Sequence, residues 1–595
     1  MIQLSEIRMM DIRVIVLGSH PGIIQSMLDY DFLVGRQQPS VIAIIASGRK
    51  QERYFWGETE VILPVAANLE HLDVEFRKAC TAVLNVQSAR RVLSSTKQAI
   101  DLLPNLKLIN IFAEQTPEAH SLELYEYAKA KEILIAGPSS VGILLPGFSK
   151  LGAIGGTQHR QLSEAGILDA GDTAVISTSG GIVNELIHTV TGTGLWVSFA
   201  MAVGGDRFPI TTPAQAMLLA EADKQTERIV YFGELGGVDE YEIAELIDEG
   251  KITKEIIAYV AGTVAELFEN PPQFGHAKAM AQNQDESASA KKARLAKSGV
   301  QVCDTFGDIA IKLEKRRQQQ EQKLPTIKTI GEREQSMIIS HISGDIDKEV
   351  QLLGKPLLQT VSENSVSSLV LSMLLGKQVQ SKKAEEFIDY VLRILVDHGP
   401  YVSGAMNTIV TARAGRDLVS SLAAGLLTVG PRFGGAINTA AECWLYGVNE
   451  GITGKQFVEG FSRNGGIIPG IGHKKYRLDL PDPRVSAIKE FAGNSNGDRY
   501  LKFALSIEAV TTTKKATLIL NVDGVIAAIL LDILESDLRY TREQLQELVD
   551  IEFFNALFVL SRSVGFTAHY LDQKRHDEGL FRLPDKAMRY LASKD

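Results

Sequence analysis

Hydrophobic residues in the first part of the chain come in short continuous runs, separated by segments with helical periodicity. Runs of this kind cover residues 12–18, 41–46, 82–86, 108–114 and 133–142. Continuous apolar strands that alternate with helices are typical of a parallel sheet covered on both faces. The pattern therefore predicts an α/β domain over residues 1–150.

A second series of apolar runs follows, at residues 173–178, 195–205, 228–237 and 255–263. Several of these runs lead directly into glycine-rich turns. Ligands of open α/β sheets bind at such strand ends. Residues 151–312 are therefore predicted to form a second α/β domain with a ligand site at the ends of its strands.

The character of the chain changes after residue 312. Residues 313–335 are polar and are predicted to form a linker or an exposed helix. From residue 336 to residue 595 apolar side chains recur at helical spacing, for example over residues 385–398. The predicted fold class is thus α/β in two domains, followed by an all-α domain.

Composition narrows the range of possible functions. The 595 residues carry a formal net charge of -10, which gives no electrostatic reason to expect nucleic-acid or anionic-membrane binding. Cys80, Cys303 and Cys443 are far apart and odd in number, so neither a disulfide framework nor a metal site is predicted. A cytoplasmic protein is expected, since no apolar run has the pattern of a signal peptide or a membrane span.

A first group of candidate residues surrounds His276, in the small-residue stretch QFGHAKAM. Two strands end in the glycine-rich turns of STSGG and GELGG, each followed by a predicted helix. The free N–H groups of a helix start bind anions, so two such starts could hold a phosphoryl group on a histidine. Glu185, one turn into the first helix, could fix the histidine tautomer. A structural histidine beside two ordinary turns remains the alternative.

A second group lies in the helical domain. His398 ends an apolar helix, His473 follows a glycine-rich turn, and Asp523 interrupts an apolar run. An aspartate is costly to bury there unless it is paired or used. With Arg484 and Arg562 as carboxylate clamps, these residues fit a tricarboxylate lyase, in which the carboxyl group protonates a departing carbon. Taken singly, each residue is more typical of a capped helix end, a core histidine or a surface arginine, so only the joint pattern indicates a lyase.

Five N-terminal motifs, in order, carry a family resemblance: GPSSVGILLPG (137–147), STSGGIVNEL (177–186), GGDRFP (204–209), GELGG (233–237) and FGHAKA (274–279). They resemble the α subunit of succinyl-CoA synthetase, and still more closely the matching part of ATP-citrate lyase. The resemblance implies a Rossmann-like CoA-binding domain and a flavodoxin-like ligase domain. It also implies that His276 carries the phosphoryl group, that Glu185 orients it, and that Gly236 and Gly237 contact citrate.

The nucleotide site of that family is not recognisable in this sequence. No GxxxxGK[ST] loop occurs, and no stretch resembles an ATP-grasp domain. The resemblance therefore implies that ATP and Mg²⁺ bind to a separate ATP-grasp partner subunit, while coenzyme A is a substrate of this chain.

The C-terminal motifs resemble citrate synthase, and most closely the last domain of ATP-citrate lyase: residues 397–415, 417–436, 470–476, 511–524 and 569–575. The resemblance implies that His398 binds the oxaloacetate part, His473 handles the hydroxyl or carbonyl oxygen, and Asp523 is the acid or base at the acetyl carbon. Arg484 and Arg562 would hold citrate carboxylates, and Lys514 and Lys515 would meet the CoA phosphates.

Three positions depart from the family patterns. Phe433 stands in the region where citrate synthase has a catalytic histidine, which favours the lyase branch. Lys474 replaces the arginine that follows the histidine in the lyase, and a lysine cannot reproduce a bidentate fork. Met406 replaces the histidine of the lyase's GAHNT stretch.

The favoured hypothesis is a subunit of ATP-citrate lyase that converts citrate, CoA and ATP to acetyl-CoA, oxaloacetate, ADP and phosphate through citryl-CoA. The alternatives are a standalone citryl-CoA lyase or citrate synthase with a non-catalytic CoA-binding scaffold, and a non-enzymatic CoA-binding subunit. Citrate synthases pair through their helical domains, so the resemblance also implies homo-oligomerisation there.

Overall fold

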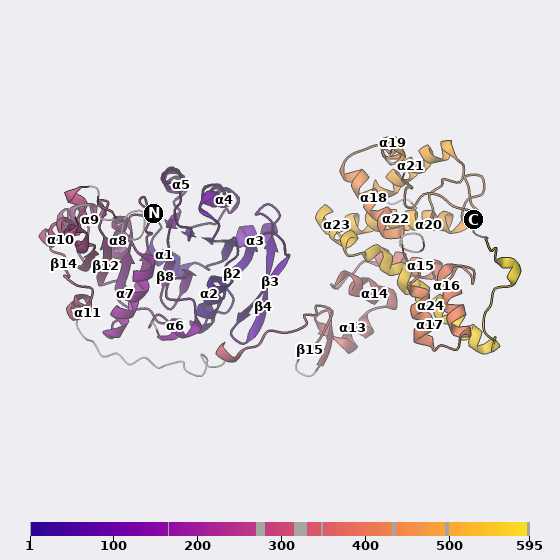
Figure 1. Ribbon diagram of the computed structural model, residues 1–595, viewed down its shortest axis with the longest axis horizontal. Coiled ribbons are helices and arrows are strands. Elements are labelled where there is room, and N and C mark those ends of the chain that lie inside the picture. The colour runs from indigo at the N-terminus through magenta and orange to yellow at the C-terminus, as the bar shows by residue number, and fades with distance from the viewer. Residues whose placement is uncertain are drawn as a thin grey trace. The chain divides into compact units, whose positions relative to one another are not determined.

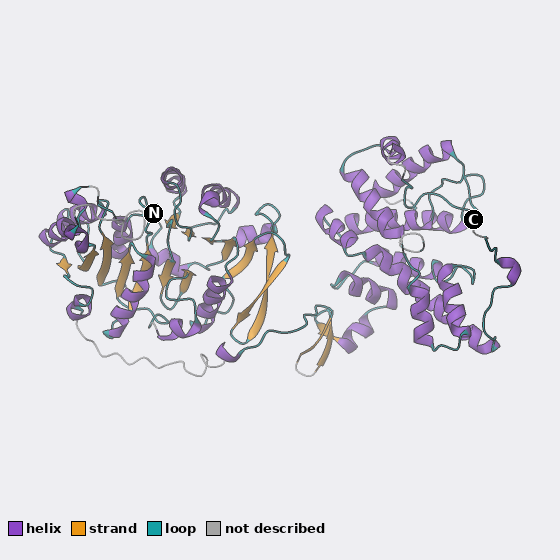
Figure 2. Cartoon of the chain, viewed as in Figure 1, coloured by secondary structure: helices purple, strands orange, loops and turns teal. Residues whose placement is uncertain are grey.

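The computed structural model describes residues 2–164, 166–268, 280–281, 283–313, 330–346, 349–430, 433, 436–463, 466–493 and 499–591. The chain divides into two compact units, residues 1–337 and residues 338–595. Strands are concentrated in the first unit, whereas the second is built almost wholly of helices (Figure 1 and Figure 2). The two α/β domains and the helical domain expected from the sequence are thus confirmed as the fold class.

The first sheet has the strand order β3-β4-β2-β1-β5-β6-β7. Its strands are β1 (Val14–Leu17), β2 (Val41–Ile45), β3 (Gln51–Trp56), β4 (Thr59–Ala66), β5 (Ala82–Asn85), β6 (Leu108–Ile111) and β7 (Leu134–Ala136). Strands β2, β1, β5, β6 and β7, which are neighbours in this order, are parallel, as their continuous apolar runs predict. The antiparallel hairpin of β3 and β4 at the edge of the sheet is not among the elements predicted from the sequence.

The second sheet has the order β14-β13-β12-β10-β11-β8-β9. Its strands are β8 (Gly142–Leu145), β9 (Ser149–Gly152), β10 (Thr173–Ser177), β11 (Val197–Ala202), β12 (Arg228–Glu234), β13 (Glu255–Ala261) and β14 (Gln301–Val302). The run over residues 133–142 is not one strand: the chain passes from the first sheet to the second between Ala136 and Gly142. This crossing lies ahead of the expected domain boundary at residue 150, because β8 and β9 join the second sheet as an antiparallel edge.

Helices connect the strands of the first unit: α1 (Leu4–Met9), α2 (Pro21–Leu33), α3 (Val74–Ala79), α4 (Ala89–Leu102), α5 (Glu118–Lys131), α6 (His159–Glu164), α7 (Gly180–Gly192), α8 (Pro213–Ala222), α9 (Asp239–Asp248), α10 (Ala288–Lys297) and α11 (Asp308–Lys312). Helix α2 joins the two sheets, since the Tyr30 hydroxyl donates to the Ile167 carbonyl at 2.8 Å. The N–H of Gly147 donates to the same hydroxyl at 3.0 Å.

The expected linker, residues 313–335, lies largely outside the described residues. Its described end packs on the first unit. Ile330 is buried, and Arg333 donates two hydrogen bonds to the Asp29 carboxylate, at 2.7 and 3.0 Å. The N–H of Ser336 donates to Glu60 at 3.1 Å. Residues 330–336 are therefore held against the first unit.

The second unit begins with a small sheet of β15 (Ser343–Ile346), β16 (Glu349–Leu352) and β17 (Lys355–Pro356). Its helices are α13 (Leu357–Glu363), α14 (Val366–Leu375), α15 (Lys382–Ile394), α16 (Ser403–Arg413), α17 (Leu418–Leu426), α18 (Ala436–Asn449), α19 (Gly454–Arg463), α20 (Pro483–Ala492), α21 (Arg499–Lys514), α22 (Val522–Ser536), α23 (Arg542–Asp550) and α24 (Phe553–His576). Helix α22 is buried along nearly its whole length and forms the centre of the core. Across the described residues, no helix is both long and apolar enough to cross a membrane.

Candidate functional site

Two glycine-rich turns lie side by side at one edge of the second sheet. Strands β10 and β12 are parallel neighbours, so the turns that follow Ser177 and Glu234 leave the sheet at the same edge. The N–H of Thr178 donates to the Phe232 carbonyl at 3.1 Å, which ties the end of one strand to the other. The juxtaposition of two helix starts, which the first candidate site requires, is thus present.

The second of these turns needs its glycines. Gly236 and Gly237 have φ angles of +84° and +67°, a region that side chains disfavour. The buried Lys291 ammonium donates to the carbonyls of Glu234 and Gly236, at 2.8 and 2.7 Å. It also forms a 2.7 Å ion pair with the buried Glu240 carboxylate. A buried cation therefore fixes the backbone of this turn.

The remaining parts of the first site are described only in part. Glu185 lies on α7, in the turn after the helix start, and its side chain is exposed. His276 lies outside the described residues. The phosphohistidine role of His276, and its pairing with Glu185, therefore stay predictions.

The second candidate site draws on several helices of the second unit. His398 lies in the loop between α15 and α16, and His473 lies in the segment between α19 and α20. Arg484 is in the first turn of α20, and Asp523 is in the first turn of α22. Arg562 comes from the middle of α24.

A close approach of backbones brings the His473 segment to α22. Gly470 has a φ of +79°, and a Cβ there would lie 2.7 Å from the Gly524 Cα. The Gly470 carbonyl accepts from Asn521 N–H at 2.9 Å, and His473 N–H donates to the Thr517 carbonyl at 3.0 Å. His473 and Asp523 are therefore anchored to opposite ends of the same backbone contact.

A chain of polar contacts then joins three of the predicted residues. Arg484 Nη1 lies 3.2 Å from His398 Nδ1. The same guanidinium donates to the Asp482 carboxylate, from Nε at 3.1 Å and from Nη2 at 2.7 Å. His473 Nε2 lies 3.8 Å from Asp482 Oδ2. Both histidines thus belong to one network centred on Asp482 and Arg484.

Arg562 is 3% exposed, and among the described residues its Nε and Nη1 have no hydrogen-bond partner. Its guanidinium carbon lies 5.0 Å from the centre of the Phe558 ring. Asp397, next to His398 in the chain, accepts from Gly399 N–H at 2.9 Å and contacts His569 Nε2 at 3.0 Å. Buried donors without partners are costly, so Arg562 is suited to receive an anionic group.

The same groups perturb one another's protonation. Burial raises the pKa of Asp523 to about 6, although the Arg484 and Arg562 cations oppose the shift. Burial, reinforced by both arginines and by His473, lowers the pKa of His398 despite the nearby Asp482 carboxylate. This arrangement favours two neutral histidines beside a carboxyl group that can carry a proton near neutral pH.

The remaining predicted residues of this site are His473, Lys514 and Lys515. Burial also lowers the pKa of His473, with Arg484 and Lys475 acting in the same direction and Asp482 against it. Lys514 and Lys515 are exposed at the end of α21, where Lys514 Nζ donates to Ser462 at 3.2 Å. The structure thus leaves their predicted contact with CoA untested.

The three departures occupy different environments. The Phe433 ring packs edge-on against Phe558, with ring centroids 5.7 Å apart, and Arg562 lies on the same helix as Phe558. Met406 lies in the first turn of α16, and Lys474 is exposed next to His473. An apolar ring at position 433 is compatible with an acyl-CoA lyase site, whereas it cannot perform proton transfer.

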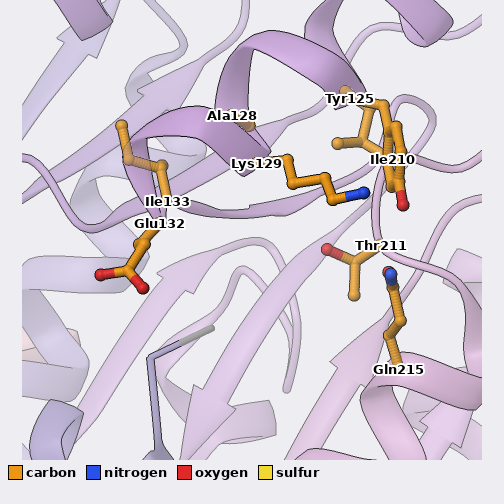
Figure 3. Close-up of a pocket in the computed structure, with 8 residues that line it drawn as sticks. All are labelled: Tyr125, Ala128, Lys129, Glu132, Ile133, Ile210, Thr211 and Gln215. Atoms are coloured by element: carbon orange, nitrogen blue, oxygen red, sulfur yellow. The ribbon is translucent and has the colours of Figure 1, made fainter.

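A separate cavity of about 250 Å³ opens between α5 and the start of α8, and none of the predicted site residues lines it. The ammonium of Lys129 lies 5.7 Å from the centre of the Tyr125 ring there (Figure 3). Among the described residues, no group of three or more His, Cys, Asp or Glu side chains could hold a metal ion.

Four residues that the sequence reading overlooked support the two sites: Asp482, Asp397, His569 and Lys291. The stretches DPR, DHGPY and HYLDQKR contain the first three, so their proximity to predicted residues in the chain was an available signal. Lys291 lies in the polar run KKARLAK, which is typical of an exposed helix. Only its burial against Glu240 distinguishes it.

Comparisons with known proteins cover both units of the chain. The CoA-ligase family matches residues 176–301, and the citrate synthase C-terminal domain family matches residues 241–584. The chain is 38% identical to the probable ATP-citrate synthase subunit 1 of Neurospora crassa, over 97% of this chain and 89% of that protein.

Two solved structures are similar along 98% of this chain and 98% of theirs, each at 32% identity. One is ATP citrate lyase from Methanothrix soehngenii in complex with citrate and coenzyme A, with a TM-score of 0.50. The other is a mutant of Methanosaeta concilii ATP citrate lyase in complex with (3S)-citryl-CoA, with a TM-score of 0.51.

Proposed function

Because the chain belongs to the ATP-citrate synthase family, also called ATP citrate lyase, we propose that its two units perform successive halves of that family's reaction. The first unit would join citrate to coenzyme A, and the second would cleave the resulting citryl-CoA. The observation that carries the second half is the cluster in which Arg484 and His473 contact the buried Asp482 and Arg484 also reaches His398.

The ligase half uses the paired helix starts of the second sheet. His276 accepts a phosphoryl group from ATP, and a citrate carboxylate oxygen then attacks the phosphorus to give citryl phosphate and free His276. The CoA thiolate attacks the acyl carbon and displaces phosphate, which yields citryl-CoA. Glu185 orients the histidine, and the Gly236 and Gly237 turn binds citrate. The adjacency of β10 and β12 supports this arrangement.

The lyase half breaks one carbon–carbon bond. The citrate hydroxyl gives its proton to solvent water, from which Asp523 is later reprotonated, and becomes the oxaloacetate carbonyl, while the electron pair of the broken bond passes to the acetyl carbon as an enolate. Asp523 protonates that carbon to release acetyl-CoA, and a pKa of about 6 supports this role. His398 and His473 hold the oxygen atoms of the oxaloacetate part. Arg562, whose Nε and Nη1 have no partner among the described residues, receives a carboxylate.

Further components lie outside this chain or on its surface. We propose that ATP and Mg²⁺ bind to a separate ATP-grasp subunit, which the name "subunit 1" of the fungal relative supports. Coenzyme A is a substrate, with its nucleotide on the first domain and Lys514 and Lys515 meeting phosphates at the lyase site. A cytoplasmic location is supported by the three cysteines, which are all free thiols.

Homo-oligomerisation through the helical unit is part of the same proposal. Helices α16, α17 and α24 pack on one another, and large apolar side chains on and beside them are exposed. Examples are Tyr401, Val419, Leu427 and Val564. Exposed apolar groups gathered on neighbouring helices are typical of an interface between subunits.

A standalone citryl-CoA lyase or citrate synthase with an inert scaffold is not favoured. The similarity to the fungal ATP-citrate synthase subunit extends over 97% of this chain, so it includes the ligase unit as well as the helical one. Phe433, in place of a catalytic histidine of citrate synthase, agrees with the lyase branch.

The lyase half can be tested on the purified chain with synthetic citryl-CoA, following oxaloacetate release with malate dehydrogenase. Asp523→Asn should lower kcat by about 100-fold or more, because the amide cannot protonate the acetyl carbon. Asp550→Asn, at the exposed end of α23, is the matched control and should retain full activity. Equal rates in wild type and Asp523→Asn would remove Asp523 from the chemistry.

A further inference from the structure

Asp482, which the sequence analysis did not name, contacts two of the predicted residues of the lyase site, Arg484 and His473. Its side chain is 1% exposed, and its Oδ1 accepts from both the Nε and the backbone N–H of Arg484, at 3.1 and 3.0 Å. Its Oδ2 accepts from Arg484 Nη2 at 2.7 Å and lies 3.8 Å from His473 Nε2. A buried carboxylate is stable only when it is compensated, so the positions of Asp482 and Arg484 depend on each other.

The fork of Arg484 transmits this constraint to a residue that Asp482 does not contact. Nε and Nη2 face Asp482, and Nη1 lies 3.2 Å from His398 Nδ1. A guanidinium can only donate hydrogen bonds, so Nδ1 of His398 must accept. The proton of the neutral His398 ring is therefore on Nε2.

His473 is held in the same tautomer by a different route. Its Nδ1 accepts from the backbone N–H groups of Lys475 and Tyr476, each at 3.0 Å. Its proton is therefore also on Nε2, the atom that faces Asp482. Both histidines thus offer an N–H donor from Nε2. The orientation of the His398 ring depends on Arg484, which Asp482 holds in place, and the Nε2 of His473 faces Asp482 itself.

We propose that Asp482 is a positioning residue for citryl-CoA cleavage, which orients Arg484 and His473 and, through Arg484, sets the tautomer of His398. This inference rests on the proposed lyase function. It also assigns different roles to Arg484 and Arg562. Asp482 occupies one edge of Arg484, whereas among the described residues the Nε and Nη1 donors of Arg562 have no partner, so Arg562 is the arginine left to receive a substrate carboxylate.

The variant Asp482→Asn removes the negative charge of the side chain while changing little else. Asparagine keeps the volume and remains a good N-cap, so the start of α20 is preserved. We expect kcat for citryl-CoA cleavage to fall about 100-fold, because Arg484 and the His398 ring lose their fixed orientation. KM should change little, since Arg562 keeps its free donors.

The acid limb of the pH profile supplies a readout that a purely structural role would not move. His398 faces Arg484, Arg562, Asp482 and His473, and of these only Asp482 raises its pKa. Removing that anion lowers the pKa of His398, and by the same reasoning that of His473. Activity that requires neutral histidines should then persist to lower pH in Asp482→Asn, whereas Asp482→Glu should restore the wild-type limb.

A matched control is Asp417→Asn. Asp417 caps α17 as Asp482 caps α20, with its Oδ1 accepting from Ser420 N–H at 3.0 Å, and none of the predicted site residues contacts it. This variant should match wild type in kcat and in pH profile. If Asp482→Asn also keeps kcat within about threefold of wild type with an unmoved acid limb, the positioning role is wrong.

A spectroscopic measurement separates this inference from the proposed function. In chain labelled with ¹⁵N-histidine, the two ring nitrogens of His398 should have the shifts of an Nε2–H tautomer, assigned by comparison with His398→Gln. Asp482→Asn should move the ring toward a mixture of tautomers. Absence of citryl-CoA cleavage in wild type would overturn the proposed function, while an unchanged His398 tautomer in Asp482→Asn would overturn the role of Asp482.

Discussion

At the scale of single residues, the pKa values of two carboxyl groups in the proposed lyase site, Asp523 and Asp482, are shifted in opposite directions. Among the described residues no hydrogen bond compensates Asp523 as Arg484 compensates Asp482, and burial raises the pKa of Asp523 to about 6. Burial acts on Asp482 as well, but the hydrogen bonds and the charge of Arg484 hold its pKa below the usual range. Pairs of carboxyl groups with separated pKa values are how proteins assign a proton carrier and a permanent anion.

A third buried titratable group belongs to neither predicted site. Lys150, on β9, is 1% exposed, and its Nζ donates to the Ser26 hydroxyl at 2.7 Å. Burial lowers its pKa to about 7, although Asp29 and Asp31 act in the opposite direction. The pKa of a lysine in the unfolded chain is near 10.4.

This shift predicts a pH dependence of stability. Between about pH 7 and 10 the unfolded chain binds a proton that folded Lys150 does not, so the free energy of unfolding rises with pH, by a few kcal/mol over the whole window. Lys150→Met should remove that rise. Calorimetry of the full chain at pH 7 to 9 would detect this as a melting temperature that increases less with pH than in the wild type. Lys251→Met, at an exposed lysine, is the control. An equally steep rise in Lys150→Met would contradict the assignment.

At the scale of elements, the lyase site depends on how closely the segment before α20 can approach α22. Gly470 and Gly524 are in backbone contact, and the Trp444 indole N–H donates to the Gly524 carbonyl at 3.1 Å. Helix α18 is thereby hydrogen-bonded to the start of α22. The position of Asp523 relative to His473 is set by this packing, because both residues lie directly beside the contact in the chain.

Gly470→Ala should therefore destabilise the helical unit by about 2–4 kcal/mol, from the positive φ together with the overpacking against Gly524. Gly415 has a φ of +86°, but a Cβ added there would meet no atom within 4 Å, so Gly415→Ala should cost only about 1–2 kcal/mol. Urea unfolding measures both costs. Cleavage of citryl-CoA should be lost only in Gly470→Ala, and equal costs in the two variants would refute the close contact.

At the scale of the whole molecule, the chain has two structural units, and each contains one predicted site. The ligase turns belong to the second sheet of the first unit, and the lyase network lies wholly within the helical unit. Residues 330–336 are bound to the first unit through Arg333 and Ile330, so the connection between the units is shorter than the polar stretch of sequence indicates.

This separation predicts independent loss of the two half-reactions. With the ATP-grasp partner present, His276→Ala should abolish formation of acetyl-CoA from citrate, ATP and CoA, because no phosphoryl group can be carried. The same variant should cleave synthetic citryl-CoA at the wild-type rate. Asp523→Asn should do the reverse and accumulate citryl-CoA. Loss of citryl-CoA cleavage in His276→Ala would mean that the two units do not act separately.

Much of the fold was predictable because it depends on local pattern. Continuous apolar runs predict buried parallel strands, and apolar residues at helical spacing predict the helices of the second unit. The pattern does not predict the hairpin of β3 and β4, because QERYFW mixes charged and aromatic residues and TEVILPVA contains a glutamate and a proline. The run over residues 133–142 was read as one strand because its composition does not reveal that the chain changes sheets at Ala136.

The sequence by itself determined which residues are chemically able to act: His398, His473, Asp523, Arg484 and Arg562 are named by their types and motifs. Only the tertiary structure decided how they are paired. Arg484 reaches Asp482 two positions away, yet its other contact, His398, is 86 positions away in the chain. Local pattern reports on neighbouring residues, whereas charge pairing, burial and tautomers depend on atoms that folding brings together from distant segments.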